Sequence, residues 1–188
     1  MINLAELFSA IRFSLRDTGK QRVSDIELVY AFNAFNTMVM SRISREKLPL
    51  MVQYETIYMY DGEGTLPSDY MGVYKVRDGN NREVTKARYE NPSRLSNEYF
   101  IEGEFIYSDR DELKIVYYPV PKRIDLSDTY YDINPLFFDM YLDGVRSMLS
   151  GNTKGVSAIM FRLRDYTNAL TFGDIPNDYP LGGGYPVD

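Results

Sequence analysis

The sequence predicts an α+β fold. A helical bundle of two N-terminal and two C-terminal helices carries an inserted small antiparallel β-sheet subdomain and an extended C-terminal tail. Apolar residues recur at helical spacing near both ends, the apolar period switches to two from residue 50, and the last fifteen residues have no period. We therefore expect the bundle over 1–49 and 134–173, the β subdomain over 50–133 and an extended arm over 174–188.

The first predicted helix covers residues 3–18. Asn3 is expected to cap its N-terminus, and Gly19 is expected to end it. Its apolar positions follow a spacing of three and four residues: Leu4, Leu7, Phe8, Ile11 and Leu15.

The second predicted helix, over 25–44, has the best-defined start in the sequence. Ser24 and Glu27 have the spacing of a capping box, in which each side chain accepts a hydrogen bond from the other residue's backbone N–H. Its expected buried stripe is Leu28, Phe32, Phe35, Val39 and Ile43.

From residue 50 onward the sequence predicts strands joined by turns. The run at 51–60 places Tyr54 and Tyr58 on one face of a strand. The turn residues at 78–81 predict a hairpin, and Gly103 indicates a turn or a bulge within a longer strand. The expected strands are 51–60, 71–77, 82–86, 99–107 and 112–118.

Two more helices follow a polar link. For the first, over 135–150, Asn134 is the expected cap, Pro135 the first residue and Gly151 the residue after the end. Its stripe is expected to be Phe138, Tyr141, Leu142, Val145 and Leu149. The second covers 156–171, with the stripe Ile159, Met160, Leu163, Tyr166 and Leu170.

The composition excludes several kinds of chemistry. The chain has 188 residues, with 21 Lys and Arg against 27 Asp and Glu, a net charge of −6, and no His or Cys. Catalytic triads and dyads that need His or Cys, and zinc sites built on imidazole or thiolate, are therefore excluded. The apolar runs are also far shorter than the roughly 18 residues of a membrane span, so no membrane partner is expected.

Acidic residues are the remaining candidates for catalysis. Carboxylate pairs could be drawn from Glu55, Glu102, Glu104 and Asp109, but ordinary surface positions of a sheet explain them as well. The acidic turns do not match the spacing of a calcium-binding loop. We predict no catalytic, metal-binding or cofactor-binding residue, no cofactor, and a protein that is not an enzyme.

Basic and aromatic residues suggest contact surfaces. Arg12 and Arg16 lie four residues apart, on the polar face of the first helix, and Arg42 and Arg45 lie near the end of the second. This set forms a charged face between subunits, a contact with a nucleic-acid phosphate backbone, or a solvated surface. The 17 Tyr residues, against no Trp, fit half-buried sheet faces and subunit interfaces equally.

The C-terminal arm, residues 174–188, is long enough to reach another molecule when it is extended. Extended, it spans roughly 50 Å, whereas a domain of this length has a radius of gyration of about 16 Å. Its prolines lower the entropy lost on docking. The residues expected to dock are Ile175, Pro176, Tyr179, Pro180, Leu181, Tyr185, Pro186 and Val187. A frayed terminus is the alternative.

Several segments of the chain resemble a known family. They are L-P-S-D-Y at 66–70, the short strand Gly72–Arg77, YFIEGEFIY…DELKIVYYPVP over 99–121 and DINPLFFDMYLDGVRSML over 132–149. With the two N-terminal helices, this layout resembles the head-to-tail adaptors of short-tailed bacteriophages, the connector or tail-tubular-A-like ring proteins. The resemblance covers about residues 1–172.

The resemblance implies a structural protein of the virion, located at the head–tail junction and made in the cytoplasm of the bacterial host. About twelve copies would form a ring that meets the portal protein on one side and the next tail or ring protein on the other. DNA would pass through the lumen without specific binding. The family often uses a C-terminal extension to grip the portal or an adjacent ring, which implies a docking role for the arm.

Two other functions stay open. A tyrosine-rich β face would suit a receptor- or carbohydrate-binding module, although the helices take up nearly half of the chain and there is no Trp to stack on a sugar. A hydrolase that uses Asp or Glu is the third hypothesis, but no paired acidic motif supports it.

Overall fold

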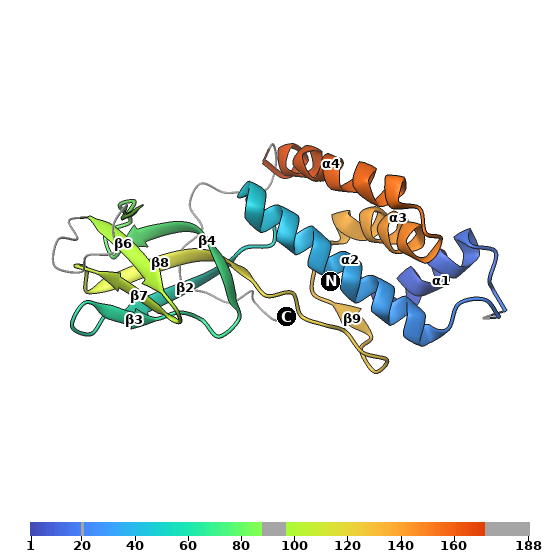
Figure 1. The fold of residues 1–188 in the computed structure, drawn as a ribbon, viewed down its shortest axis with the longest axis horizontal. Coiled ribbons are helices and arrows are strands. Elements are labelled where there is room, and N and C mark those ends of the chain that lie inside the picture. The colour runs from blue at the N-terminus through green and yellow to red at the C-terminus, as the bar shows by residue number, and fades with distance from the viewer. Residues whose placement is uncertain (20, 88–96, 172–188) are drawn as a thin grey trace. The chain divides into compact units, whose positions relative to one another are not determined.

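The computed structural model describes residues 1–19, 21–87 and 97–171 and shows a mixed α+β protein (Figure 1). The chain divides into two compact units. The first contains residues 1–46 and 121–169, and the second contains residues 47–120. The C-terminal arm, with all the residues expected to dock, lies outside the described residues.

The first unit holds the four α-helices of the described chain. They are α1 (Leu4–Ser14), α2 (Asp25–Glu46), α3 (Phe138–Leu149) and α4 (Thr153–Thr171), and a 3-10 turn (Pro135–Phe137) precedes α3. Helix α3 packs against both α1 and α2. Two short strands, β1 (Ile2–Asn3) and β9 (Tyr130–Tyr131), pair antiparallel and hold the start of the chain beside the segment that precedes α3.

Local capping signals in the sequence are confirmed. Ser24 Oγ accepts from the backbone N–H of Glu27 at 3.2 Å, and Glu27 Oε2 accepts from the N–H of Ser24 at 2.7 Å, so the capping box forms. Asn3 caps α1 and Asn134 caps the 3-10 turn that precedes α3, both through side-chain oxygens. Gly151 follows α3 with a φ of 68°, the left-handed conformation expected there.

The end of α1 differs from the prediction. The helix ends at Ser14, four residues early, and Arg16 rather than Gly19 adopts the left-handed conformation, with a φ of 56°. The cause is Asp17, which is buried and accepts hydrogen bonds from three backbone N–H groups of residues 21–23. These bonds turn the chain back before a further helical turn can form.

The predicted stripe of α2 is confirmed, since all five of its residues are fully buried. The stripe of α3 is rotated. Tyr141 and Val145 are buried as predicted, but Met140 and Gly144 complete the buried face, and Phe138 is only half-buried. Gly144 causes the rotation, because only a residue without a β-carbon fits against the ring of Phe35. On α4, among the side chains described, Val156 and Leu163 are buried, and Ile159 and Met160 of the predicted stripe are half-buried. The predicted stripe residues Tyr166 and Leu170 lie outside the described side chains.

The segment before α3, which the sequence assigned to the β subdomain, packs on α2. The side chain of Asn33 pairs with the backbone of Ile124 in both directions, with N–O distances of 2.9 Å. Asn36 donates to the hydroxyl of Tyr131 at 2.6 Å and accepts from the hydroxyl of Tyr141 at 2.5 Å. These two buried asparagines fix residues 121–133 to the helical unit.

The second unit contains two sheets. The three-stranded sheet has the order β2-β8-β4, and the four-stranded sheet has the order β3-β7-β6-β5. All pairs are antiparallel except β5–β6. The strands are β2 (Gln53–Tyr58), β3 (Glu63–Thr65), β4 (Tyr70–Asp78), β5 (Thr85–Lys86), β6 (Glu98–Glu102), β7 (Phe105–Ser108) and β8 (Glu112–Pro119).

The strands of the second unit differ from the prediction in three places, the first of which is β3, a strand that the sequence did not predict. Gly103, with a φ of 60°, forms a turn that splits the predicted strand 99–107 into β6 and β7. The predicted partner strand 82–86 pairs with β4 only through a bridge between Arg77 and Glu83, and it then joins β6 in parallel as β5. Sequence patterns do not specify such a non-local parallel pair of two residues.

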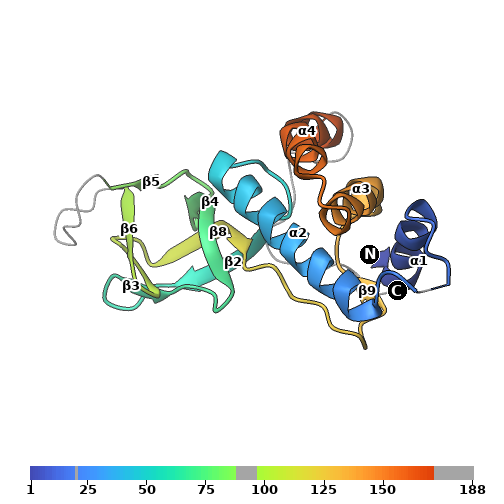
Figure 2. The same ribbon diagram turned by 45° about the vertical axis from the view of Figure 1, so that its right-hand side comes forward.

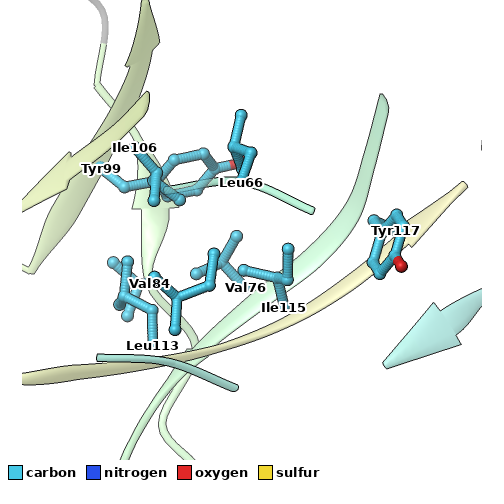
Figure 3. Packing of buried hydrophobic residues seen from close by; sticks show 9 residues of the cluster. Leu66, Val76, Val84, Tyr99, Ile106, Leu113, Ile115 and Tyr117 are labelled. Carbon is cyan, nitrogen blue, oxygen red and sulfur yellow. The ribbon is translucent and has the colours of Figure 1, made fainter. Parts of the chain in front are cut away.

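Side chains from both sheets form the core of the second unit (Figure 3). Tyr99 and Tyr117 belong to this core, so part of the tyrosine content is structural. The core residues are Ile57, Leu66, Val76, Val84, Tyr99, Ile106, Leu113, Ile115 and Tyr117.

Candidate interaction surfaces

The outward side of α2 lacks charge. No charged residue occurs between Leu28 and Ser41, a run of 14 residues in the middle of a surface helix. Four exposed side chains follow one another at a spacing of four: Ile26, Tyr30, Ala34 and Met38. The largest of them, Tyr30, is 68% exposed. A solvated helix face normally carries charges, so this outer face of α2 has the character of a surface that a partner covers.

Helices α2 and α4 belong to the same helical unit (Figure 2), and residues of both helices line a groove that includes Met38 of the outer face. It has a volume of about 420 Å³ and is lined by residues of both helices. Arg42 and Arg45 come from α2, while Met160 and Phe161 come from α4. The remaining lining residues are Thr37, Met38, Ser41, Val156 and Ser157. The groove therefore combines apolar side chains from both helices with two arginines from α2.

Arg42 contacts both sides of the groove. Its guanidinium lies 5.8 Å from the centre of the Phe161 ring, and it forms an ion pair with Glu46. Glu46 also pairs with Arg164 of α4, with an N–O distance of 3.1 Å. Among the described residues, Nε of Arg42 is buried without a hydrogen-bond partner.

The four predicted arginines do not share one face, because the structure buries Arg12. Its side chain is 5% exposed, pairs with Asp17 at 3.2 Å and Asp25 at 2.6 Å, and donates to the carbonyl of Val23. The prediction for Arg12 as an inter-subunit contact is therefore corrected. Its acidic partners lie beyond the end of α1, which helical spacing alone does not reveal.

The other three arginines are accessible to different degrees. Arg16 is exposed, but it lies beyond the end of α1 and therefore shares no helix face with Arg12. Arg45 is exposed on the groove wall, and Arg42 is half-buried beside it. The structure thus keeps only Arg42 and Arg45 together as a basic pair.

Arg12, Asp17 and Asp25 form a charged cluster in which the pKa of the Asp17 carboxyl is lowered. Burial raises the pKa of the Asp17 carboxyl, but hydrogen bonds from the backbone N–H groups of Arg22, Val23 and Gln21, together with the Arg12 guanidinium, outweigh this effect. The net pKa of Asp17 is below its ordinary value. The ionised cluster fixes the link between α1 and α2 and is structural.

A second surface lies on the β unit. Tyr54, Tyr58 and Tyr60 are exposed on or just after β2, and Tyr58 is 75% exposed. A groove of about 670 Å³ runs beside this strand. Its lining residues are Glu55, Thr56, Ile57, Tyr58, Thr65, Leu66, Pro67, Ser68, Asp69 and Tyr117. Of the three exposed tyrosines, Tyr58 lines this groove, together with the carboxylates of Glu55 and Asp69.

Residues 66–69 of the motif L-P-S-D-Y line this groove, and the motif also forms the turn that leads into β4. Leu66 is buried, and the N–H of Tyr70 donates to the carbonyl of Pro67 at 3.0 Å, which turns the chain into β4. The Tyr117 hydroxyl donates to Asp69 Oδ1 at 3.0 Å. Burial and then the Asp69 carboxylate raise the pKa of Tyr117. This hydroxyl therefore stays protonated and holds the turn against β8.

The acidic residues considered for catalysis lie at separate exposed positions. Glu55 is on β2, Glu102 ends β6, and Glu104 and Asp109 lie in turns, and all four are exposed. Within residues 1–19, 21–87 and 97–171, no group of three acidic side chains is placed to hold a metal ion.

Sequence reasoning missed the outer face of α2 and the groove beside it. The available signal was the absence of charge between residues 28 and 41. It was overlooked because the apolar residues of this run were attributed to the buried stripe of the same helix.

Comparisons with known proteins give no assignment. No protein-family model and no curated protein matches this chain. In the part of the chain that the structure describes, no helix has the length and apolar character required to cross a bilayer.

Proposed function

We propose that this chain is a structural protein, the head-to-tail adaptor of a short-tailed bacteriophage. About twelve copies form a ring at the head–tail junction of the virion, after synthesis in the cytoplasm of the bacterial host. The ring binds the portal protein and the next tail or ring protein, and DNA passes through its centre. The protein performs no catalysis in this role and needs no cofactor.

One observation carries this proposal: the uncharged, exposed outer face of α2 in a helix whose opposite stripe is fully buried. A ring subunit contacts its two neighbours through two different surfaces. Each contact surface is an exposed face of a subunit that is already folded, and the outer face of α2 meets this description. Exposed aromatic and aliphatic side chains such as Tyr30 and Met38 suit the centre of such an interface.

We include in this proposal the arrangement of the helices, the β subdomain and the C-terminal arm. The four helices act as one bundle, the β subdomain is inserted between its two halves, and the arm extends away to fasten on a second molecule. A net charge of −6 suits a ring around moving DNA, because a strongly basic lumen would bind the phosphates and hold the DNA in place.

The test is ring assembly on a portal, followed by electron microscopy. Tyr30→Glu places a charge in the outer face of α2 and is expected to abolish ring formation. Because the side chain is exposed, the free energy of unfolding should change by no more than about 0.5 kcal/mol. Tyr60→Glu, an equally exposed tyrosine of the β unit, is the matched control and should leave assembly intact. Normal rings with Tyr30→Glu would contradict the proposed contact.

A receptor- or carbohydrate-binding module is the second candidate. The exposed Tyr54, Tyr58 and Tyr60 beside a groove of about 670 Å³ favour it, since aromatic faces stack on sugar rings. A glycan array with the full chain tests this function. Binding that Tyr58→Ala removes and Tyr30→Ala retains would support the module over the adaptor.

A further inference from the structure

The groove between α2 and α4 has the chemistry of a site for an acidic, partly apolar extended segment. Its apolar surface comes from both helices, and Phe161 is 74% exposed beside it. Among the lining residues, Arg45 is exposed and Arg42 is half-buried, and both carry a positive charge. A ligand with carboxylates and apolar side chains would complement both features.

The chain itself contains a segment of this chemistry. The last 24 residues, 165–188, hold four Asp and neither Lys nor Arg. Within them the arm alternates acidic residues with apolar ones, as in Asp174-Ile175 and Asp178-Tyr179. Three prolines limit the freedom that the arm loses on binding. Another acidic stretch without Lys or Arg, residues 124–145, is part of the folded helical unit and so is not available as an extended segment.

The geometry of α4 points to the arm of another copy. Arg42 contacts Phe161 and Glu46 pairs with Arg164, so α4 runs in the same direction as α2 along the groove (Figure 1). From Phe161 the helix continues to Thr171, about 15 Å further on. An arm that entered the groove of its own chain would have to reverse direction immediately after α4. A neighbour's arm, with a reach of roughly 50 Å, needs no such reversal.

We propose that this groove binds the C-terminal arm, residues 174–188, of a neighbouring copy. The arm carboxylates meet Arg42 and Arg45, and its apolar side chains lie on Phe161 and Met160. The inference rests on the proposed function, because each subunit of a ring then gives its arm to one neighbour and receives an arm from the other. This contact is heterologous and repeats until the ring closes.

The absence of cysteine makes a direct test possible. The full-length double variant Ser157→Cys with Tyr179→Cys places one thiol on the groove wall and one in the arm. After concentration and oxidation, we expect a ladder of covalent oligomers on a non-reducing gel, which disappears on reduction. The control pairs Tyr179→Cys with Ser9→Cys, an exposed serine on α1. A ladder no stronger than this control would overturn the inference.

The same gel separates the two possible donors of the arm. A monomer that has lost both free thiols, with no oligomers, would show that the arm occupies its own groove and would overturn the inference. Adding Arg45→Gln to the double variant should lower the initial rate of cross-linking about two- to fivefold, as expected for one exposed charge pair. An unchanged rate would rule out the proposed pairing of arm carboxylates with Arg45.

Failure of this inference differs from failure of the proposed function. If portal complexes show rings of this chain but the double variant gives no ladder, the arm docks elsewhere and the adaptor function stands. If the ladder forms but no ring assembles on a portal, copies exchange arms and the adaptor function is wrong.

Discussion

Gly144 of α3 lies directly against the ring of Phe35 of α2, and a β-carbon at position 144 would clash with three carbons of that ring. Both residues are buried, and the Phe35 ring also packs edge-on against Tyr141, with centroids 5.4 Å apart. This contact sets how closely α2 and α3 approach, and it positions the opposite, outer face of α2.

Gly144→Ala should therefore destabilise the protein by about 1–3 kcal/mol, through overpacking, although alanine favours helices. Chemical denaturation monitored by circular dichroism measures this change. Gly79→Ala is the control, because a β-carbon there meets only ordinary contacts with Glu112. The account of this interface would be wrong if both variants unfolded at the same denaturant concentration.

Ser24→Ala should cost about 1 kcal/mol, because it removes the acceptor for the backbone N–H of Glu27 at the start of α2. Ser9→Ala, at an exposed helical position of α1, should change the free energy of unfolding by less than about 0.5 kcal/mol. Equal unfolding free energies for both variants would mean that the capping box contributes nothing measurable.

Acid should destabilise the helical unit through Asp17 and Glu27. Burial raises the pKa of Asp17, but three backbone hydrogen bonds and the Arg12 guanidinium outweigh this effect, so the pKa lies below that of an ordinary aspartate. Hydrogen bonds from Ser24 lower the pKa of Glu27 in the same way. A depressed carboxyl pKa gives stability that is fully present above the unfolded pKa and is lost as pH falls through the folded pKa. Stability should thus hold from pH 7 to about 5 and decline below about 4.

The variant Asp17→Asn tests the source of this decline. It should be less stable than the parent at pH 7, and the difference should shrink as the pH falls below 4, where the parent's Asp17 becomes protonated. Asp61→Asn, in an exposed turn, serves as the matched control. A constant difference between parent and Asp17→Asn over pH 3 to 7 would show that the charge of Asp17 contributes nothing.

Deletion of residues 174–188 should leave the melting temperature unchanged and weaken binding between copies of the chain, because the arm docks on a neighbouring copy. Differential scanning fluorimetry and a pull-down of untagged chain by a tagged copy measure the two effects. A full-length control with Tyr179→Ala and Tyr185→Ala should bind as weakly as the deletion, because the anchors are lost while the length is kept. Unfolding or aggregation of the truncated chain would instead show that the arm packs against the folded core of its own chain.

The sequence predicted the features that depend on neighbouring residues. The Ser24–Glu27 box and the glycine end at Gly151 follow from local chemistry, and both form as predicted. Asn134 caps the 3-10 turn that precedes α3 rather than α3 itself. The buried stripe of α2 followed from its period. The mixed α+β class followed from the order of these local signals.

Features that depend on distant partners were not predictable. The burial of Arg12 needs Asp25, which approaches only after the chain turns at Asp17. The pairs β1–β9 and β5–β6 have two residues a strand, too few to leave a pattern. The groove depends on how α4 lies beside α2, and helical spacing does not specify that arrangement.

The most direct test of the central claim is electron microscopy of this chain assembled on its portal. The account predicts a closed ring of copies below the portal, with Tyr30 and Met38 of each copy covered by an adjacent subunit. A portal that recruits no ring of this chain, or a ring in which the outer face of α2 is open to solvent, would contradict it.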